Sequence, residues 1–404
     1  MELGAEADEH AGAVFERLKA IIYADAGLPA ALAPLPTVEA LAEALAGLAA
    51  AHGLDLPREA VTSRLRPDPL GLSRFAPPSP LRPLKAASGW LPVAVIATGA
   101  GPLVDWAWFG ERPLAEAFYE ESIRHAINLP FNRLFRFHTP LDQLPDWTAG
   151  LELMEPDGFI FHLSRCGSTL AAQMLAASSA NVVVSEAAPI DVAAQIARAD
   201  PGRGVPLLRA MVRAFGQRRD PRARRLFIKL DSWHTLALPQ FRQAFPRTPF
   251  VFMYRQPVEV MVSQMRQRGT QMVPEYLPPA FYGLTLEAAP DEDYCARVLA
   301  AVCAGVLAAP ANEVLLVDYA EMPGALFSRI LPHFAARPDD GEARAMAAAA
   351  AFDAKAAGGA FTPDSQAKRK AASPAVLAAA ARRLDATHAR LEARREAQIV
   401  ARKD

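Results

Sequence analysis

FIFHLSRCGSTLAAQ, residues Phe159–Gln173, combines a short apolar run, a turn of small residues and the start of a helix. The run Phe159–Phe161 predicts a buried strand, and Leu170–Ala177 has the composition of a helix. Backbone N–H groups at the start of a helix have no partners within it, and the helix dipole there favours negative charge. The stretch therefore predicts a phosphate-binding loop between a strand and a helix.

The residues of the turn supply the groups that an anion site needs. Gly167 lets the backbone approach a ligand closely, Ser168 and Thr169 offer hydroxyl donors, and Arg165 is a fixed cation. The loop is not that of nucleotide kinases, which have Gly, four residues, then Gly-Lys-Ser/Thr. Here His162 stands at the first glycine position and Ser168 at the lysine position.

A second stretch, PFVFMYRQPVEVMVSQ (Pro249–Gln264), has the same strand-to-helix pattern about ninety residues later. Its strand, Phe250–Tyr254, is followed by Arg255 and then by a helix that contains Ser263. An arginine offers a bidentate fork to a phosphate, and a helical serine adds a directed donor. This stretch predicts a second anchor for a phosphorylated ligand. In the simpler interpretation, Arg255 is a strand-end charge and Ser263 a helix-surface residue.

The two stretches together resemble the sulfotransferases that use 3′-phosphoadenylyl sulfate (PAPS). The family has Lys/Arg-Ser-Gly-Thr-Thr where this chain has Arg165-Cys166-Gly167-Ser168-Thr169, so Cys166 and Ser168 are departures. The resemblance implies that Arg165–Thr169 bind the 5′-phosphosulfate and that Arg255 and Ser263 bind the 3′-phosphate. The function implied is transfer of the sulfuryl group of PAPS to a hydroxyl or amine of a small-molecule or peptide acceptor.

A late basic segment, FTPDSQAKRK (Phe361–Lys370), stands where the family closes a loop over the 3′-phosphate. The resemblance implies this role for Lys368 and Arg369, although the family's Arg-Lys-Gly triplet is not reproduced. A solvated run of charges is an equally good interpretation.

The catalytic groups come from two other predicted strand ends. In IKLDSWH, Lys229 stands where related enzymes have a lysine that reaches the transferring group, which the resemblance implies here. Asp231 occupies the position of the family's catalytic histidine, so the base is open among Glu186, His234 and Asp231. Glu186 ranks first, because it ends the second strand and related sulfotransferases use a glutamate. Alternatively, Glu186 caps the following helix or pairs with Arg165.

From about residue 155 onward, apolar runs alternate with helical stretches. This alternation predicts an α/β fold with a three-layer arrangement, a parallel sheet with helices on both faces. The expected strands are Phe159–Leu163, Val182–Val184, Leu226–Leu230, Phe250–Tyr254 and Val314–Val317. The expected regions are a helical N-terminal region (1–64), a proline-rich linker (65–85), an aromatic-rich accessory segment (86–150) and the α/β domain with its C-terminal helix (151–404).

Two N-terminal features leave alternatives open. The first sixty residues faintly resemble the helical leader-type domain of Nif11-like proteins, but a helical hairpin packed on the main domain explains them as well. A group of aromatic residues lines an acceptor pocket or fills a core, and we favour the core: Trp106, Trp108, Phe109, Phe118 and Tyr119.

Composition excludes several classes of protein. A net charge of −1 over 404 residues does not suit general nucleic-acid or anionic-membrane binding. Three cysteines form no disulfide framework and no metal-binding spacing, so we expect a reducing cytoplasm and no metal.

The alternatives to a sulfotransferase are a nucleotide-dependent kinase, which the missing lysine disfavours, and a non-catalytic nucleotide- or peptide-binding protein. The oligomeric state is open.

Overall fold

The computed structural model describes residues 2–25, 27–65, 89–149, 151–274, 277–285, 289–352 and 364–401. Most of the expected linker, 65–85, lies outside the described residues, as do 361–363 of the late basic segment. The chain forms two compact units. The first comprises Met1–Arg112, Glu120–Leu153 and Arg213–Pro221, and the second Pro113–Tyr119, Met154–Val212 and Arg222–Asp404.

The first unit consists of helices and a small antiparallel sheet of order β1-β2-β3. Its elements are α1 (Glu2–Ala24), α2 (Gly27–Leu32), α3 (Val38–Ala51), α4 (Arg58–Arg64), β1 (Trp90–Ile96), β2 (Leu103–Trp108), α5 (Tyr119–Ile127), α6 (Pro130–Phe135), β3 (Phe137–Pro140) and α7 (Leu144–Ala149). Thr37 caps α3 by accepting the Ala40 N–H at 3.1 Å. The sheet is packed with buried aromatic rings, among them Trp90 and Phe137, whose centroids are 4.9 Å apart.

The second unit is built on a five-stranded parallel sheet of order β5-β6-β4-β7-β8. The strands are β4 (Gly158–His162), β5 (Asn181–Ser185), β6 (Arg225–Lys229), β7 (Phe250–Tyr254) and β8 (Val314–Asp318). All residues of β4, β6, β7 and β8 are buried, as expected for a parallel sheet covered on both faces. The chain leaves β4 toward β5 in one direction and later crosses from β6 to β7 in the other. The carboxyl end of β4 is therefore the position at which ligands bind in open α/β sheets.

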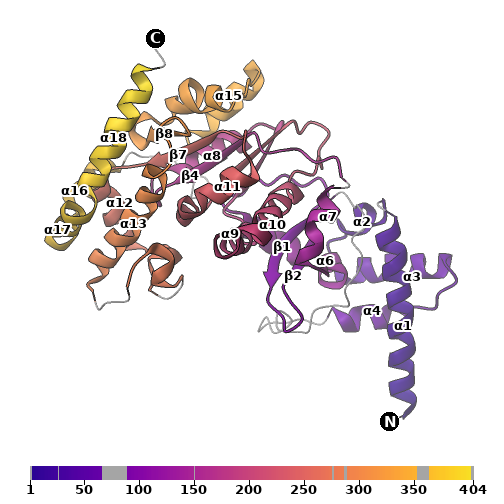
Figure 1. The fold of residues 1–404 in the computed structure, drawn as a ribbon. Helices are drawn as coiled ribbons and strands as arrows, with labels where there is room; N and C mark the ends of the chain where they lie inside the picture. The colour runs from indigo at the N-terminus through magenta and orange to yellow at the C-terminus, as the bar shows by residue number, and fades with distance from the viewer. Residues whose placement is uncertain are drawn as a thin grey trace. The chain divides into compact units, whose positions relative to one another are not determined.

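Helices cover both faces of this sheet (Figure 1). Right-handed crossovers place α8, which follows β4, on one face, and the helices between β5 and β8 on the other. The helices are α8 (Ser168–Ala176), α9 (Ala188–Ala199), α10 (Pro201–Ala214), α11 (Leu238–Ala244), α12 (Pro257–Arg266), α13 (Asp291–Leu307), α14 (Leu331–His333), α15 (Asp340–Ala349), α16 (Ser365–Lys370), α17 (Pro374–Arg383) and α18 (Asp385–Val400).

The last helix, α18, packs along the edge strand β8 (Figure 1). The side chain of Gln398 accepts the Leu316 N–H at 3.0 Å and donates to the Val314 carbonyl at 2.8 Å. It thereby satisfies two backbone groups that an edge strand otherwise leaves open. Further along α18, Glu392 accepts a hydrogen bond from the hydroxyl of Tyr254 in β7.

The α/β fold class and the helical N-terminal region are confirmed, and the five expected strands agree with the observed ones to within a residue at each end. The helix after the first strand begins at Ser168 rather than Leu170, because Gly167 already has the N-cap position. The antiparallel sheet of residues 90–140 was not predicted. Its strand β1 contains Pro92 next to an irregularity in the register, and β2 is buried throughout, so neither shows a simple alternation.

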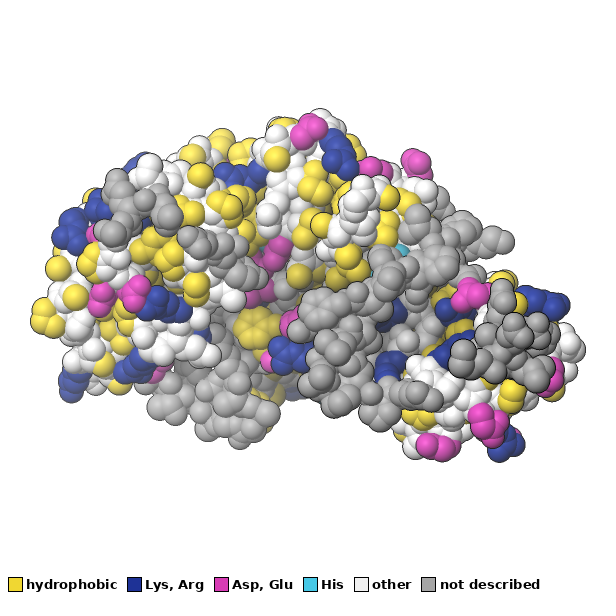
Figure 2. Space-filling view, turned by 90° about the horizontal axis from the view of Figure 1, so that it is seen from below, with side chains coloured by type: hydrophobic (Ala, Val, Ile, Leu, Met, Phe, Trp, Pro, Cys, Tyr) yellow, Lys and Arg dark blue, Asp and Glu magenta, His cyan; other side chains and the backbone are white. Residues whose placement is uncertain are grey.

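The surface has mixed charge. On the face drawn in Figure 2, basic and acidic side chains are interspersed among hydrophobic ones, in keeping with the near-zero net charge. All three cysteines are buried free thiols. Among the described residues, no helix has the length and apolar character needed to cross a bilayer.

Candidate functional site

The loop after β4 has the backbone of an anion cradle. Arg165 has φ of 61° and Gly167 has φ of 82°, so both lie in the left-handed region, and α8 begins directly after them. Gly167 is required for a second reason, because a Cβ at this position would overlap the ring of Tyr319. The hydroxyl residues Ser168 and Thr169 form the first turn of α8.

The thiol in the middle of the loop does not belong to its chemistry. The Cys166 side chain is fully buried and its Sγ donates to the Met253 carbonyl at 3.1 Å. Burial raises the pKa of this thiol to about 11, so the thiolate is not formed near neutral pH. Cys166 can therefore contribute only its backbone to an anion.

Three neighbouring strands end in one polar cluster: His162 ends β4, Glu186 follows β5 and Lys229 ends β6. Glu186 Oε1 contacts Lys229 Nζ and lies 3.3 Å from His162 Nε2. The Lys229 side chain is fully buried, whereas that of Glu186 is 21% exposed. Glu186 has φ of 52°, an unfavourable conformation for a non-glycine residue that the neighbouring contacts hold in place.

The charges of this cluster determine its protonation. Burial alone would raise the pKa of Glu186, but the Lys229 ammonium and His162 outweigh it and hold the pKa below its usual range. Burial lowers the pKa of His162, against the opposing effect of Glu186. At neutral pH the cluster is therefore an ionised Lys229–Glu186 pair beside a neutral imidazole.

Replacing Lys229 with methionine is expected to destabilise the protein by about 3–5 kcal/mol, because a buried carboxylate loses its partner. A lowered folded-state pKa contributes stability above the unfolded pKa and loses it as pH falls. Without Lys229, burial raises the folded-state pKa of Glu186 instead of leaving it lowered. The loss in free energy of unfolding should therefore be larger at about pH 8, where Glu186 is ionised, than at about pH 5. Urea unfolding at the two pH values measures both losses. Adding Glu186→Gln should recover part of the loss, and a deficit independent of pH would contradict the pairing.

The second predicted anchor lies at the end of the adjacent strand β7. The Arg255 guanidinium is buried, donates to Glu259 Oε2 and Asp364 Oδ1 at 2.6 Å each, and lies 4.1 Å from the Tyr319 ring centroid. Ser263 is half-buried and one turn beyond Glu259 on the same face of α12. The ring of Tyr319 thus contacts both predicted phosphate sites, Gly167 on one side and Arg255 on the other.

The late basic segment returns to this anchor. Helix α16 packs against α12, where Lys368 Nζ lies 2.7 Å from Asp364 Oδ2 and Arg369 Nε donates to Glu259 Oε1 at 2.7 Å. Lys368 is buried and Arg369 is exposed. Three cations, including Arg255, therefore share two carboxylates, which leaves one excess positive charge.

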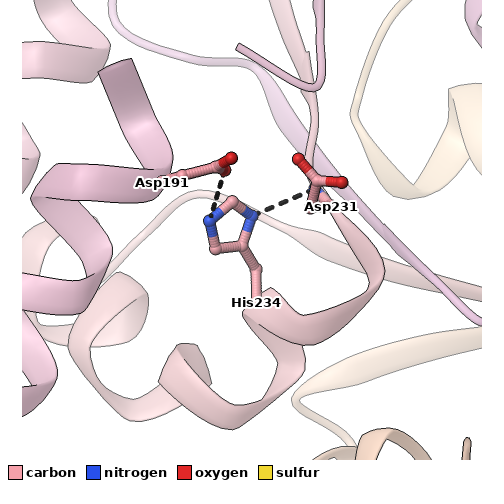
Figure 3. A group of neighbouring side chains, drawn as sticks. All are labelled: Asp191, Asp231 and His234. Carbon is pink, nitrogen blue, oxygen red and sulfur yellow. Dashed lines mark hydrogen bonds and ion pairs between the residues drawn. The ribbon is translucent and has the colours of Figure 1, made fainter. Parts of the chain in front are cut away.

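A third group of side chains comprises Asp191, Asp231 and His234 (Figure 3), and the charges of Glu186 and Lys229 act on its Asp231. Asp191, Asp231 and His234 have one polar atom each within 4.8 Å of one another. Such a set also resembles the ligands of a divalent cation. Sequence spacing did not predict the group, because Asp191 is separated from Asp231 by two helices and a strand.

The structure brings together the predicted residues in two places. Arg165, Gly167, Glu186 and Lys229 lie at the carboxyl ends of β4, β5 and β6, and Arg255, Ser263, Lys368 and Arg369 lie around the start of α12. Glu186 neither caps α9, whose N-cap residue is Ala187, nor pairs directly with Arg165, whose Nη2 donates to the Gln267 carbonyl at 2.6 Å. The roles of the predicted site residues in binding and catalysis stay predictions.

Sequence reasoning missed three residues of these clusters: His162, Asp191 and Tyr319. The position of His162 could have identified it, because it lies at the end of β4, the strand between β6 and β7. Tyr319 follows β8, where the sequence shows no phosphate-binding motif. Four of the five accessory aromatics are buried in the core, as favoured: Trp106, Trp108, Phe109 and Tyr119. The fifth, Phe118, is half-buried in the second unit, and Lys229 Nζ lies 5.2 Å from its ring centroid.

Comparison with known proteins finds similarity only among solved structures. No family model and no curated protein matches the chain, so the Nif11-like resemblance has no support. A sulfotransferase domain from the curacin biosynthetic pathway is 14% identical, with a TM-score of 0.38, over 57% of this chain and 98% of that one. The sulfotransferase domain of the Synechococcus PCC 7002 olefin synthase is 16% identical, with a TM-score of 0.33, over 53% and 83%. Sulfotransferase STF1 from Mycobacterium tuberculosis is 16% identical, with a TM-score of 0.32, over 53% and 76%. At such low values the similarity identifies no activity for this chain.

Proposed function

We propose that this chain transfers the sulfuryl group of PAPS to a hydroxyl or amine acceptor. The observation that supports this most directly is the pairing of two anion sites at adjacent strand ends. The Arg165–Thr169 cradle follows β4, Arg255 follows β7, and the ring of Tyr319 contacts both. A ligand with phosphates at both ends of one nucleoside fits such a pair better than a ligand with a single phosphate chain.

In this proposal the cradle holds the 5′-phosphosulfate, and the sites around α12 hold the 3′-phosphate. PAPS supplies an activated sulfuryl group whose departure leaves charge on the bridging phosphate oxygen. Arg165, the amides of Gly167–Thr169 and Lys229 stabilise that charge by fixed donors and cations, much as in phosphoryl transfer. At the second anchor, the 3′-phosphate has to replace Asp364 on Arg255. The Asp364 side chain is 45% exposed, so it can leave.

The acceptor binds beside Lys229 in this scheme. The ring of Phe118, 5.2 Å from the ammonium, offers it an apolar surface. The proton of the acceptor passes to one of three groups at the same strand ends, Glu186, Asp231 or His234. The two alternatives remain a nucleotide-dependent kinase, which lacks the loop lysine here, and a binding protein without turnover.

Calorimetry with adenosine 3′,5′-bisphosphate (PAP) tests the proposal. PAP is expected to bind, and 5′-AMP to bind more weakly, because it cannot reach the second anchor. Ser263→Ala should weaken PAP binding by about 0.5–1.5 kcal/mol and leave 5′-AMP unchanged, since one hydrogen bond to the 3′-phosphate is lost. ATP with Mg²⁺ binding more tightly than PAP would favour the kinase, and no affinity for PAP would refute the proposal.

A further inference from the structure

The group Asp191, Asp231 and His234 is unused by the cofactor-binding scheme (Figure 3). Asp231 comes two residues after Lys229, at the start of the short helix Ser232–Ala237 that contains His234. Asp191 comes from the first turn of α9. His234 is 1% exposed, whereas both carboxyl groups are partly accessible.

The hydrogen bonds of His234 fix which of its nitrogens bears the proton. The backbone N–H of Asp231 donates to Nδ1 at 3.0 Å, so Nδ1 is the acceptor and Nε2 is protonated in the neutral ring. Nε2 lies 3.0 Å from Asp191 Oδ1, and neither atom has a hydrogen bond to another described residue. Burial lowers the pKa of His234 to about 4, so the ring is neutral. An N–H group rather than a lone pair therefore faces the carboxyl groups, which suits proton transfer and not a metal ion.

The two carboxyl groups lie close together, because one polar atom of each is within 4.8 Å of the other and of His234. Two buried carboxyl groups this close do not both ionise readily. Burial raises the pKa of Asp191 to about 8, and the charge of Glu186 adds to this. Burial also raises the pKa of Asp231, followed by repulsion from Asp191 and Glu186, whereas His234 and Lys229 act in the opposite direction. Near neutral pH the pair holds a proton, while Glu186 is ionised by its contact with Lys229.

We infer that Asp231 is the catalytic base and that Asp191 is a residue that positions and tunes it, which rests on the proposed sulfuryl transfer. A lone pair of the acceptor oxygen forms the new bond to sulfur. The bond between sulfur and the 5′-phosphate oxygen breaks, and its electron pair stays on the phosphate. The acceptor proton passes to a carboxylate oxygen of Asp231. Glu186 is less suited, because a carboxylate held by an ammonium is a weak base.

Infrared spectroscopy of the full chain tests the shared proton without any acceptor. At neutral pH the wild-type protein is expected to show the C=O stretch of a buried protonated carboxyl. The double variant Asp191→Asn/Asp231→Asn should remove this band, and the matched variant Glu186→Gln should retain it. A band that persists in the double aspartate variant overturns the inference, as does Mn²⁺ binding in one equivalent that Asp231→Asn abolishes.

Transfer of labelled sulfate from PAPS to 2-naphthol, used as a phenolic probe, tests the catalytic role. Asp231→Asn is expected to lower kcat by about 10²–10⁴-fold, the usual contribution of general base catalysis, with PAP affinity unchanged. Wild-type activity should rise with pH as Asp231 loses its proton. Asp191→Asn should move that rise to lower pH, because the neighbouring charge that raises the pKa of Asp231 is gone.

The failures of the two proposals are distinguishable. If wild-type protein does not bind PAP, the proposed function is wrong, whatever the infrared spectra show. If PAP binds and Asp231→Asn transfers sulfate at the wild-type rate, only the inference about the base is wrong. Loss of transfer in Glu186→Gln, with Asp231→Asn as active as the wild type, would assign the base to Glu186 instead.

Discussion

Arg255→Lys is expected to weaken the binding of PAP by about 1.5–3 kcal/mol, roughly tenfold to a hundredfold or more. Lysine keeps the positive charge but loses the planar fork that binds a phosphate through two parallel hydrogen bonds. It also loses the stacked contact with the ring of Tyr319, 4.1 Å from the guanidinium carbon. Calorimetric titration with PAP and with 5′-AMP measures the effect, which should be confined to PAP.

Lysine is chosen over alanine because Glu259 and Asp364 both contact this guanidinium, and an uncharged residue would leave the buried Glu259 carboxylate without its closest partner. Arg225→Lys is the matched control. Arg225 is also buried and paired with a carboxylate, Glu342, but it begins β6 at the opposite end of the sheet. Equal losses in both variants would show that Arg255 acts through stability, and no loss in either would remove the second anchor from the proposal.

Gly167→Ala is expected to abolish PAP binding and to destabilise the protein. Alanine at φ of 82° costs about 1–2 kcal/mol for the left-handed backbone. The added methyl group also overlaps the ring of Tyr319, and such overpacking costs about 1–3 kcal/mol. Relief of that overlap moves either the cradle or the ring, and both belong to the proposed site. Urea unfolding and calorimetry with PAP measure the two effects.

Gly283→Ala separates strain from overlap. Gly283 has φ of 69°, but a Cβ there meets no atom within 4 Å, so this variant carries the backbone cost alone. It should lose about 1–2 kcal/mol of stability and keep its affinity for PAP. If Gly167→Ala behaved like Gly283→Ala in both measurements, the contact between the loop and Tyr319 would have no part in ligand binding.

The parallel sheet could be predicted because its strands are short apolar runs, each followed by a turn and a helix. Phe250–Tyr254 is an example, since both ends of this strand agree with the structure. The position of the cradle follows from Gly167, which lies between a strand and a helix. These features are local in sequence, so neighbouring residue types determine them.

The partners of the site residues could not be predicted, because they depend on contacts between distant segments. Arg255 appeared available for a phosphate, but α16 brings Asp364 to it across more than a hundred residues. Glu186 follows a predicted strand, but its position in the sequence does not identify its partner: the register of β5 against β6 places Lys229 beside it. The approach of Asp191 to Asp231 and His234 likewise depends on how α9 packs against the short helix Ser232–Ala237.

The position of Gln398 has a consequence for synthesis of the chain. Because this side chain covers the backbone groups of Val314 and Leu316, the outer edge of β8 stays open until α18 has been synthesised and has packed. An exposed strand edge pairs readily with other chains, so molecules that lack α18 should be prone to aggregate. Packing of α18 should therefore protect that edge.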